Sequence, residues 1–377
     1  MSDLEPKPQQ PGEYVDALAQ GPVRGRGAGI NPANRFESIR LHVLGETLDE
    51  RALESPCGGR VPTQILDDTT HTLINRVESP DLPFDWTINP YRGCEHGCVY
   101  CYARPGHEYL GMSAGLDFET RIMVKRDAPR VLRRELGRAS WMGEPIVMAG
   151  VTDVYQPIER ELEITRGCLK VMAECRQPVG IVTKNRMVVR DVDLLQELAR
   201  CNAARVAISL TTLDNDLASK MEPRASSPAA RLAAMRELAG AGVCVSVMTA
   251  PIIPGLNDHE LPTLLKAARD AGATHAGWVL LRLPHQIKDV FIDWLGRHYP
   301  GRAAHVASLI RQTHDGELYR SDFHTRHRGS GPIAQRIASV FKVFAARHGL
   351  DRPCQRLESA GFRRPLEDGS GQMRLFG

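Results

Sequence analysis

Three cysteines in the stretch Asn89–Ala103, NPYRGCEHGCVYCYA, have the spacing of a metal-binding loop. Cys94, Cys98 and Cys101 follow the pattern C-x3-C-x2-C, and thiolates so close together on one loop can converge on a single metal centre. A zinc ion needs a fourth protein ligand, whereas a [4Fe–4S] cluster held by three cysteines leaves one iron open to a small molecule. The trio therefore predicts a reactive iron–sulfur centre, and a zinc site with His96 as fourth ligand is the alternative.

The cysteine pattern, with Tyr100 directly before the last cysteine, resembles the cluster motif of the radical S-adenosylmethionine (SAM) superfamily. The wider stretch 89–103, together with TDVYQPIE at 152–159, is similar to the branch related to spore photoproduct lyase, which includes many uncharacterised bacterial proteins. The repair lyases carry a hydrogen-donating cysteine at the end of the second barrel strand. Residues 148–153, MAGVTD, contain no cysteine, so photoproduct repair is not expected here.

The resemblance implies a chemistry as well as a family. Cys94, Cys98 and Cys101 are expected to hold a [4Fe–4S] cluster whose open iron binds SAM. A reductant such as flavodoxin or ferredoxin would supply the electron that cleaves SAM to a 5′-deoxyadenosyl radical, and that radical would abstract hydrogen from an unidentified substrate. Gly93 and Gly97 are expected to let the loop backbone approach the cluster closely.

The elements that must position this loop are short apolar runs, each followed by a helical pattern, between about residues 85 and 300. The runs are 86–88, 146–149, 179–183, 205–209, 243–248 and 276–281. Continuous apolar runs that alternate with helices are typical of a parallel sheet with helices outside it. Six units are fewer than the eight of a closed barrel, so we expect an α/β fold of the open, TIM-like partial (β/α)6 type, which is also what the resemblance implies.

Polar residues at the carboxyl ends of these strands are the candidate SAM contacts, because active residues of such folds lie at that edge. The resemblance implies contacts of the second strand end with the SAM ammonium, which Asp153 suits, and of the fourth and fifth strand ends with ribose and adenine. Lys184 and Arg224 suit the SAM carboxylate. The candidates are Gly150, Thr152, Asp153, Thr183, Lys184, Ser209, Thr211, Arg224 and Asn257. The sequence identifies no catalytic residue beyond these cofactor contacts.

The two ends of the chain differ from the core at 85–300. Residues 1 to about 35 are rich in Pro, Gly and Gln and are expected to form a mobile arm, as part of a partly flexible N-terminal arm at 1–60. In residues 301–377, Arg and Lys outnumber Asp and Glu, and this basic C-terminal extension has two interpretations. The favoured one is a solvated cap on the open side of the barrel, and the other is a nucleic-acid contact that uses Tyr319 and Phe323.

Composition limits the remaining function classes. The chain has 377 residues, 42% of them hydrophobic, a net charge of +3 and nine cysteines, which argues against a disordered chain or a disulfide scaffold. It contains no apolar stretch of membrane-spanning length and no leader-like start, so a cytoplasmic protein without membrane contact is expected. The competing hypothesis to a radical SAM enzyme is a non-catalytic zinc- or iron-binding regulator that contacts nucleic acid through its basic extension.

Overall fold

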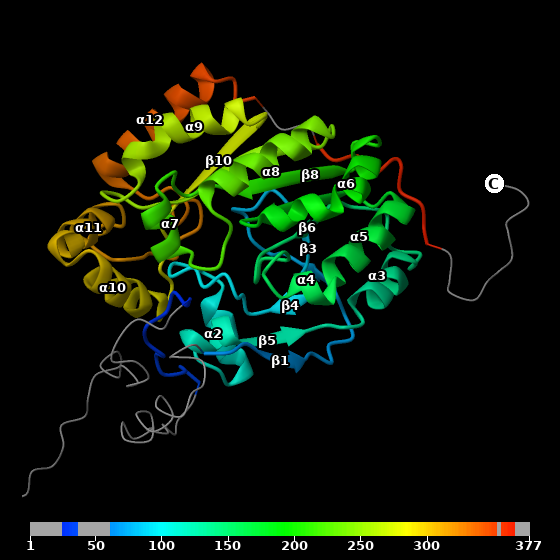
Figure 1. Cartoon of the computed structure of the whole chain (residues 1–377), viewed down its shortest axis with the longest axis horizontal. Helices are drawn as coiled ribbons and strands as arrows, with labels where there is room; N and C mark the ends of the chain where they lie inside the picture. Colours follow the sequence, from blue (N-terminus) through cyan, green and yellow to red (C-terminus); the bar gives the residue numbers. More distant parts are fainter. Residues whose placement is uncertain (1–24, 37–60, 353–355, 366–377) are drawn as a thin grey trace, which may run out of the picture.

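The structure is a computed structural model that describes residues 25–36, 61–352 and 356–365. Its centre is a seven-stranded sheet with the strand order β10–β9–β8–β7–β6–β3–β2 (Figure 1). Six of these strands run parallel to one another, and β2 pairs antiparallel with β3 at one edge. The strands are β2 (Ile74–Arg76), β3 (Trp86–Ile88), β6 (Ile146–Met148), β7 (Val179–Thr183), β8 (Ala204–Ser209), β9 (Cys244–Ile252) and β10 (His275–Leu280).

Helices follow the strands in the predicted alternation and cover the outer face of the sheet (Figure 1). They are α3 (Ala128–Leu136), α4 (Glu159–Leu162), α5 (Ile164–Cys175), α6 (Val192–Ala199), α7 (Asn215–Met221), α8 (Pro228–Gly240), α9 (Leu261–Asp270) and α10 (Ile287–His298), with the short 3-10 helices η2 (Arg186–Asp191) and η3 (Asp258–Glu260). One core joins apolar side chains of β3, β6, β7, β8 and β9 to those of α3, α5, α6, α8 and α9. The predicted α/β architecture with six parallel strands is confirmed.

A second, three-stranded sheet was not foreseen. Its strands are β1 (Gln64–Asp67), β5 (Arg121–Val124) and β4 (Tyr91–Arg92), in the order β1–β5–β4. The segment between β4 and β5 contains the 3-10 helix η1 (Arg104–Leu110) and the helix α2 (Leu116–Thr120). Because β4 directly precedes the cysteines, this small sheet fixes one end of the cysteine loop.

The basic C-terminal extension closes the free edge of the main sheet. It begins with α11 (Pro300–Gln312) and contains α12 (Gly331–Arg347). The backbone N–H groups of Ala276 and Leu280 on β10 donate to the carbonyls of Leu350 and His327, at 3.0 and 2.9 Å. The extension therefore satisfies an edge strand that would otherwise expose unpaired backbone groups.

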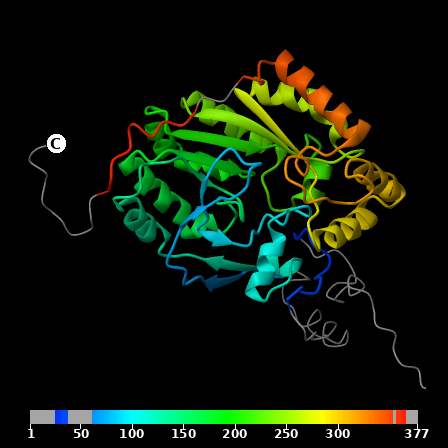
Figure 2. The same ribbon diagram turned by 180° about the vertical axis from the view of Figure 1, so that it is seen from behind.

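The described part of the N-terminal arm, residues 25–36, packs on the body of the protein; we call it the N-terminal strap. Ala28 and Ile30 are buried with Leu116 of α2 and Val290 of α10. Figure 2 shows the ribbon of the strap, in dark blue, beside that of α2, in cyan. The expectation of a mobile arm is therefore wrong for these residues, and the rest of that expectation lies outside the described residues. Among the described helices, none is long and apolar enough to cross a membrane.

Candidate active site

The cysteine loop runs from Gly93 to Tyr102, between β4 and η1. Gly93 and Gly97 have φ angles of 83° and 68°, in the left-handed region that favours glycine. A Cβ atom on Gly93 would lie 2.8 Å from a ring carbon of His107, and one on Gly97 would lie 2.6 Å from Glu119 Oε2. The backbone conformation of the loop and its close contacts with η1 and α2 therefore both require glycine at these two positions, independently of any cluster.

The three predicted cluster ligands lie together in a buried environment. Cys94 and Cys98 are 6% and 8% exposed, and Cys101 is half-buried. Burial raises the pKa of all three thiols, and for Cys94 the charges of Asp153, Cys98 and Cys101 raise the pKa further. The backbone amides of Asp153 and Ala103 hydrogen-bond to Cys94 and Cys101, which lowers the pKa of each thiol and favours a thiolate. The loop thus brings three thiols and two sulfur-directed N–H donors to one place.

The zinc alternative lacks a suitable ligand set. In the part of the chain that the structure describes, no group of three or more His, Cys, Asp or Glu side chains is arranged to hold a single metal ion. The thiolates of a cubane cluster bind different irons and so lie farther apart than the ligands of one zinc ion. His96, the suggested fourth ligand, has Nδ1 3.3 Å from Asp153 Oδ2 and Nε2 3.2 Å from Asn185 Nδ2. The position of the metal in this loop, and the choice of its protein ligands, stay predictions.

Asp153 connects the end of β6 to the end of β7 by hydrogen bonds. Its Oδ1 accepts hydrogen bonds from Thr183 Oγ1 at 2.7 Å and from the Tyr155 amide at 2.9 Å, and its Oδ2 accepts from the Lys184 amide at 2.7 Å. Burial raises the pKa of Asp153, but the charge and hydrogen bond of His96 and the two bonds from Thr183 and Lys184 outweigh burial and lower it to about 2. The carboxylate is therefore ionised and already surrounded by donors, and its contact with a SAM ammonium stays a prediction.

Lys184 supplies a positive charge beside the cysteines. Its Nζ donates to Ser209 Oγ at 2.7 Å and lies 5.7 Å from the centre of the Tyr100 ring. Its charge lowers the pKa of Cys98 and Cys101, although burial has the larger and opposite effect on both. No carboxylate of the described residues lies within 4 Å of this ammonium. Lys184 is thus available to an anionic group of a bound cofactor.

A buried ion pair, Glu222 with Arg231, packs against the cysteine loop at Tyr100. Glu222 and Arg231 form a salt bridge in which the side chains are 0% and 1% exposed. Glu222 also accepts hydrogen bonds from the hydroxyl of Tyr100 and, at 2.6 Å, from Thr211 Oγ1. Burial raises the pKa of Glu222, but Arg231 and Lys184 and the hydroxyl bonds lower it to about 2. The pair therefore holds Tyr100, between two cluster cysteines, against the end of β8.

Gly150 and Thr152 follow β6, as predicted. Gly150 has a φ of 118°, and open space lies where its Cβ would be. Thr152 Oγ1 donates to the Gly93 carbonyl at 2.6 Å and accepts from Gln156 Nε2 at 3.1 Å. Thr152 therefore fastens the end of β6 to the start of the cysteine loop, and Gly150 leaves its side of that edge clear for a ligand.

Arg224 and Asn257 are engaged within the protein. Arg224 Nη2 lies 3.1 Å from Glu95 Oε1 in the cysteine loop. Asn257 Nδ2 donates to the carbonyls of Thr211 and Pro251, at 2.9 and 3.0 Å, and so joins the ends of β8 and β9. The predicted contacts of these two residues with SAM stay predictions.

The N-terminal strap lies directly on the cysteine loop. The amides of Gly27 and Ala28 donate to the two oxygens of Glu119, at 2.9 and 2.8 Å. The same carboxylate binds Arg104, which is fully buried and whose Nε donates to the Cys98 carbonyl at 2.9 Å. Glu119 thus connects the strap to the backbone of a cluster ligand.

Sequence reasoning missed these buried carboxylates. The search was guided by residues that directly follow a strand in the sequence, and this holds for none of Glu119, Glu222, Arg104 and Arg231. Charged residues are rarely fully buried unless they are paired, but a sequence does not reveal the pairing. One local signal was present in the sequence, since Glu222 directly follows a short amphipathic segment that ends at Met221.

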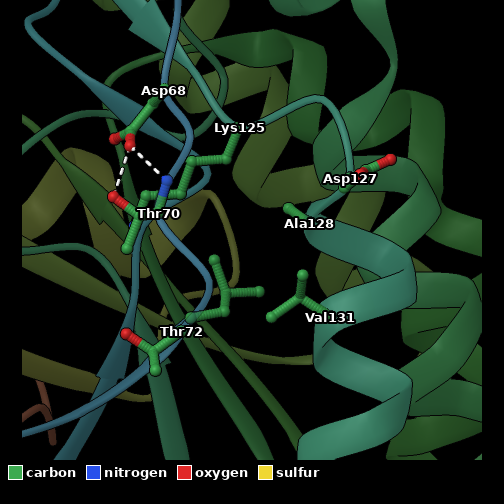
Figure 3. Close-up of a pocket in the computed structure, with 8 residues that line it drawn as sticks. Asp68, Thr70, Thr72, Lys125, Asp127, Ala128 and Val131 are labelled. Atoms are coloured by element: carbon green, nitrogen blue, oxygen red, sulfur yellow. Dashed lines mark hydrogen bonds between the residues drawn. The ribbon is translucent and has the colours of Figure 1, made fainter.

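A small pocket elsewhere does not overlap this site. It lies between the segment after β1 and the start of α3, and it contains the buried Lys125, whose pKa is lowered by burial (Figure 3). Its lining residues are Asp68, Thr70, Thr72, Leu73, Lys125, Asp127, Ala128 and Val131. None of the predicted cluster or SAM contacts is among them, so the pocket has no part in the site.

The fold and the three-cysteine loop define the class of the protein. The family model of the radical SAM superfamily matches residues 88–268, which include the cysteine loop and the strands β6 to β9. The chain therefore belongs to the radical SAM superfamily, and it is an enzyme of that class. The superfamily uses a [4Fe–4S] cluster and SAM, so the predicted family and cofactors are confirmed.

Sequence relatives and solved structures agree with this assignment. An uncharacterised protein of Mycobacterium tuberculosis is 38% identical over 244 residues, which cover 64% of this chain and 72% of that protein. An uncharacterised protein of Methanocaldococcus jannaschii is 29% identical over 50% of this chain and 67% of that protein. A variant of spore photoproduct lyase has a similar structure, with a TM-score of 0.55 and 17% identity over 84% of this chain and 85% of that chain. At that identity the likeness shows a shared fold alone.

Proposed function

We propose that this enzyme holds a [4Fe–4S] cluster at Cys94, Cys98 and Cys101 and cleaves SAM reductively, so that a 5′-deoxyadenosyl radical abstracts hydrogen from its substrate. The observation that carries the proposal is the presence of three thiols on one loop with the Lys184 ammonium beside them, which has no described carboxylate within 4 Å. When bound, the cluster supplies the electron for cleavage of the sulfonium bond.

The chain's own residues prepare the ligands. The thiols are protonated in the free protein, because burial raises the pKa of each one. Metal binding must therefore displace their protons, and the amides of Asp153 and Ala103 then donate to the sulfurs of Cys94 and Cys101. Hydrogen bonds of this kind stabilise thiolate charge and tune the potential of a cluster.

Lys184 and its neighbours would orient SAM. Ser209 holds the Lys184 ammonium at 2.7 Å, and the Lys184 amide is fixed by Asp153. A charge-assisted hydrogen bond from this ammonium to the SAM carboxylate would place the sulfonium near the cluster. Asp153 then acts as a positioning residue that aligns the ends of β6 and β7.

The test is anaerobic reduction of the reconstituted protein in the presence of SAM. We expect release of 5′-deoxyadenosine and methionine, measured by chromatography. SAM that carries deuterium at C5′ would reveal the substrate through exchange of label with candidate molecules. If the reduced, iron-loaded protein left SAM intact both alone and with cell extract, the proposal would be wrong.

A further inference from the structure

Two buried polar atoms without a partner lie in one loop, the segment 281–286 between β10 and α10. Four buried side-chain atoms in the described residues make no hydrogen bond by strict geometry: Asp68 Oδ2, His96 Nδ1, Arg282 Nε and Gln286 Oε1. The first two face charged partners, Arg92 at 2.9 Å and Asp153 at 3.3 Å. Arg282 and Gln286 have no such compensation. Buried polar groups are almost always satisfied, so this loop has capacity for a ligand.

The loop lies at the catalytic edge of the sheet. It follows β10, whose parallel pairing with β9 brings its carboxyl end to the edge that also carries Asp153, Lys184 and Ser209. Leu281 and Leu283 pack in the same buried apolar cluster as Cys98 and Tyr100. Arg282, between the two leucines, is therefore close to the cysteine loop.

Arg282 stacks on an exposed aromatic ring beside a cluster ligand. Its guanidinium lies 5.2 Å from the centre of the Tyr102 ring, and Tyr102 directly follows Cys101. The Tyr102 side chain is 50% exposed.

The charge of Arg282 is not neutralised. Its Nη1 lies 2.8 Å from His327 Nε2, and burial together with Arg282 and Arg326 lowers the pKa of that histidine to about 4, so the imidazole is neutral and accepts the hydrogen bond. Asp81, whose charge acts on this histidine, is already held by Arg326 at 2.5 Å. No described carboxylate lies within 4 Å of Arg282. A planar guanidinium in this state is suited to bind an oxyanion.

We propose that Arg282, stacked on Tyr102 and held by His327, forms the subsite that binds an anionic group of the substrate, either phosphate or carboxylate. This inference rests on the proposed function, because it assigns the recognised group to the substrate of that reaction. Gln286 offers a buried acceptor in the same loop for a hydroxyl or amino group of the same molecule. The substrate class is then a polar, anionic molecule.

The test measures anion binding directly on the full chain, loaded with cluster and saturated with SAM at low ionic strength. Inorganic pyrophosphate and citrate serve as the phosphate and carboxylate probes in titration calorimetry. We expect one saturable site for at least one probe, and Arg282→Met should weaken it by about tenfold or more. Arg311→Met, which removes an exposed charge on α11, should leave the affinity unchanged. The preferred probe distinguishes phosphate from carboxylate.

Further variants keep the result interpretable. Arg282→Lys retains charge without the planar fork and should bind with intermediate affinity, and iron content and thermal unfolding confirm that each variant is folded. Equal affinity of wild type and Arg282→Met, or no saturable binding, would overturn the inference. A loss of SAM affinity in Arg282→Met would also overturn it, because the residue would then belong to the SAM site. Failure of wild type to cleave SAM would instead refute the proposed function, independently of the anion titration.

Discussion

Replacing Glu222 by Gln tests whether the buried ion pair behind the cysteine loop stabilises the fold. The substitution keeps the shape of the side chain but leaves the charge of Arg231, which is 1% exposed, without a counter-ion. Breaking a buried pair in this way costs roughly 3–5 kcal/mol. The pKa of Glu222, about 2 against an ordinary value of 4.5, gives a similar figure of about 3 kcal/mol, since each pH unit corresponds to about 1.4 kcal/mol.

The measurement is urea denaturation of the cluster-free chain, followed by circular dichroism. Glu222→Gln should lower the free energy of unfolding by about 3 kcal/mol at pH 7. The matched control is Glu237→Gln on the same helix as Arg231, α8, where Glu237 and Arg186 form an exposed pair that contributes less than about 1 kcal/mol. Equal stability of the two variants would refute the assignment of Glu222 as a stabilising residue.

The same variant predicts a pH dependence. Because the folded pKa of Glu222 is depressed, its contribution is fully present above the unfolded value near 4.5 and is lost as the pH falls toward about 2. The difference in stability between wild type and Glu222→Gln should therefore shrink across this range. A difference that stayed constant from pH 5 to about 2 would contradict this reasoning.

Two further predictions concern the cofactor and the strap. Lys184→Met should weaken SAM binding by about tenfold or more in equilibrium dialysis, because a charge-assisted contact is lost. The control Lys266→Met, on the outer helix α9, should bind SAM as wild type does. Equal affinities of the two variants for SAM would show that Lys184 is not part of the SAM site. Gly27→Ala places a Cβ 1.8 Å from the Gly97 carbonyl, so it should displace the N-terminal strap and speed the loss of visible cluster absorbance in air. Gly106→Ala, whose Cβ meets open space, should not, and identical decay of the two variants would show that the strap does not shield the cluster.

The sequence was sufficient for those parts of the fold that leave a local pattern. The six parallel strands are short and apolar and alternate with helices, so this alternation alone predicted their number and their parallel arrangement. The three cysteines could also be identified from the sequence, because they lie on one loop and their spacing alone indicates a metal-binding motif. The strand ends could also be found, and the structure brings Asp153, Lys184 and Ser209 together there.

Contacts between distant segments were not predictable from the sequence. The N-terminal strap has no periodic pattern, and its burial depends on hydrogen bonds to Glu119, which is more than 90 residues away. The three-stranded sheet pairs Gln64 of β1 with Arg121 of β5, which is also a contact between distant segments. The proposed role of Arg282 likewise depends on tertiary contacts, because its guanidinium contacts Tyr102 and His327, which are distant in the sequence.

The central claim is that Cys94, Cys98 and Cys101 hold a cluster that cleaves SAM, and anaerobic reconstitution tests it most directly. Wild type should take up about four irons per chain and release 5′-deoxyadenosine from SAM on reduction. Cys98→Ala should lose both properties, whereas Cys168→Ala, at a buried cysteine in the apolar core, should retain them. A Cys98→Ala protein that kept its cluster and its activity, or a wild-type protein that bound a single colourless metal ion, would contradict the account.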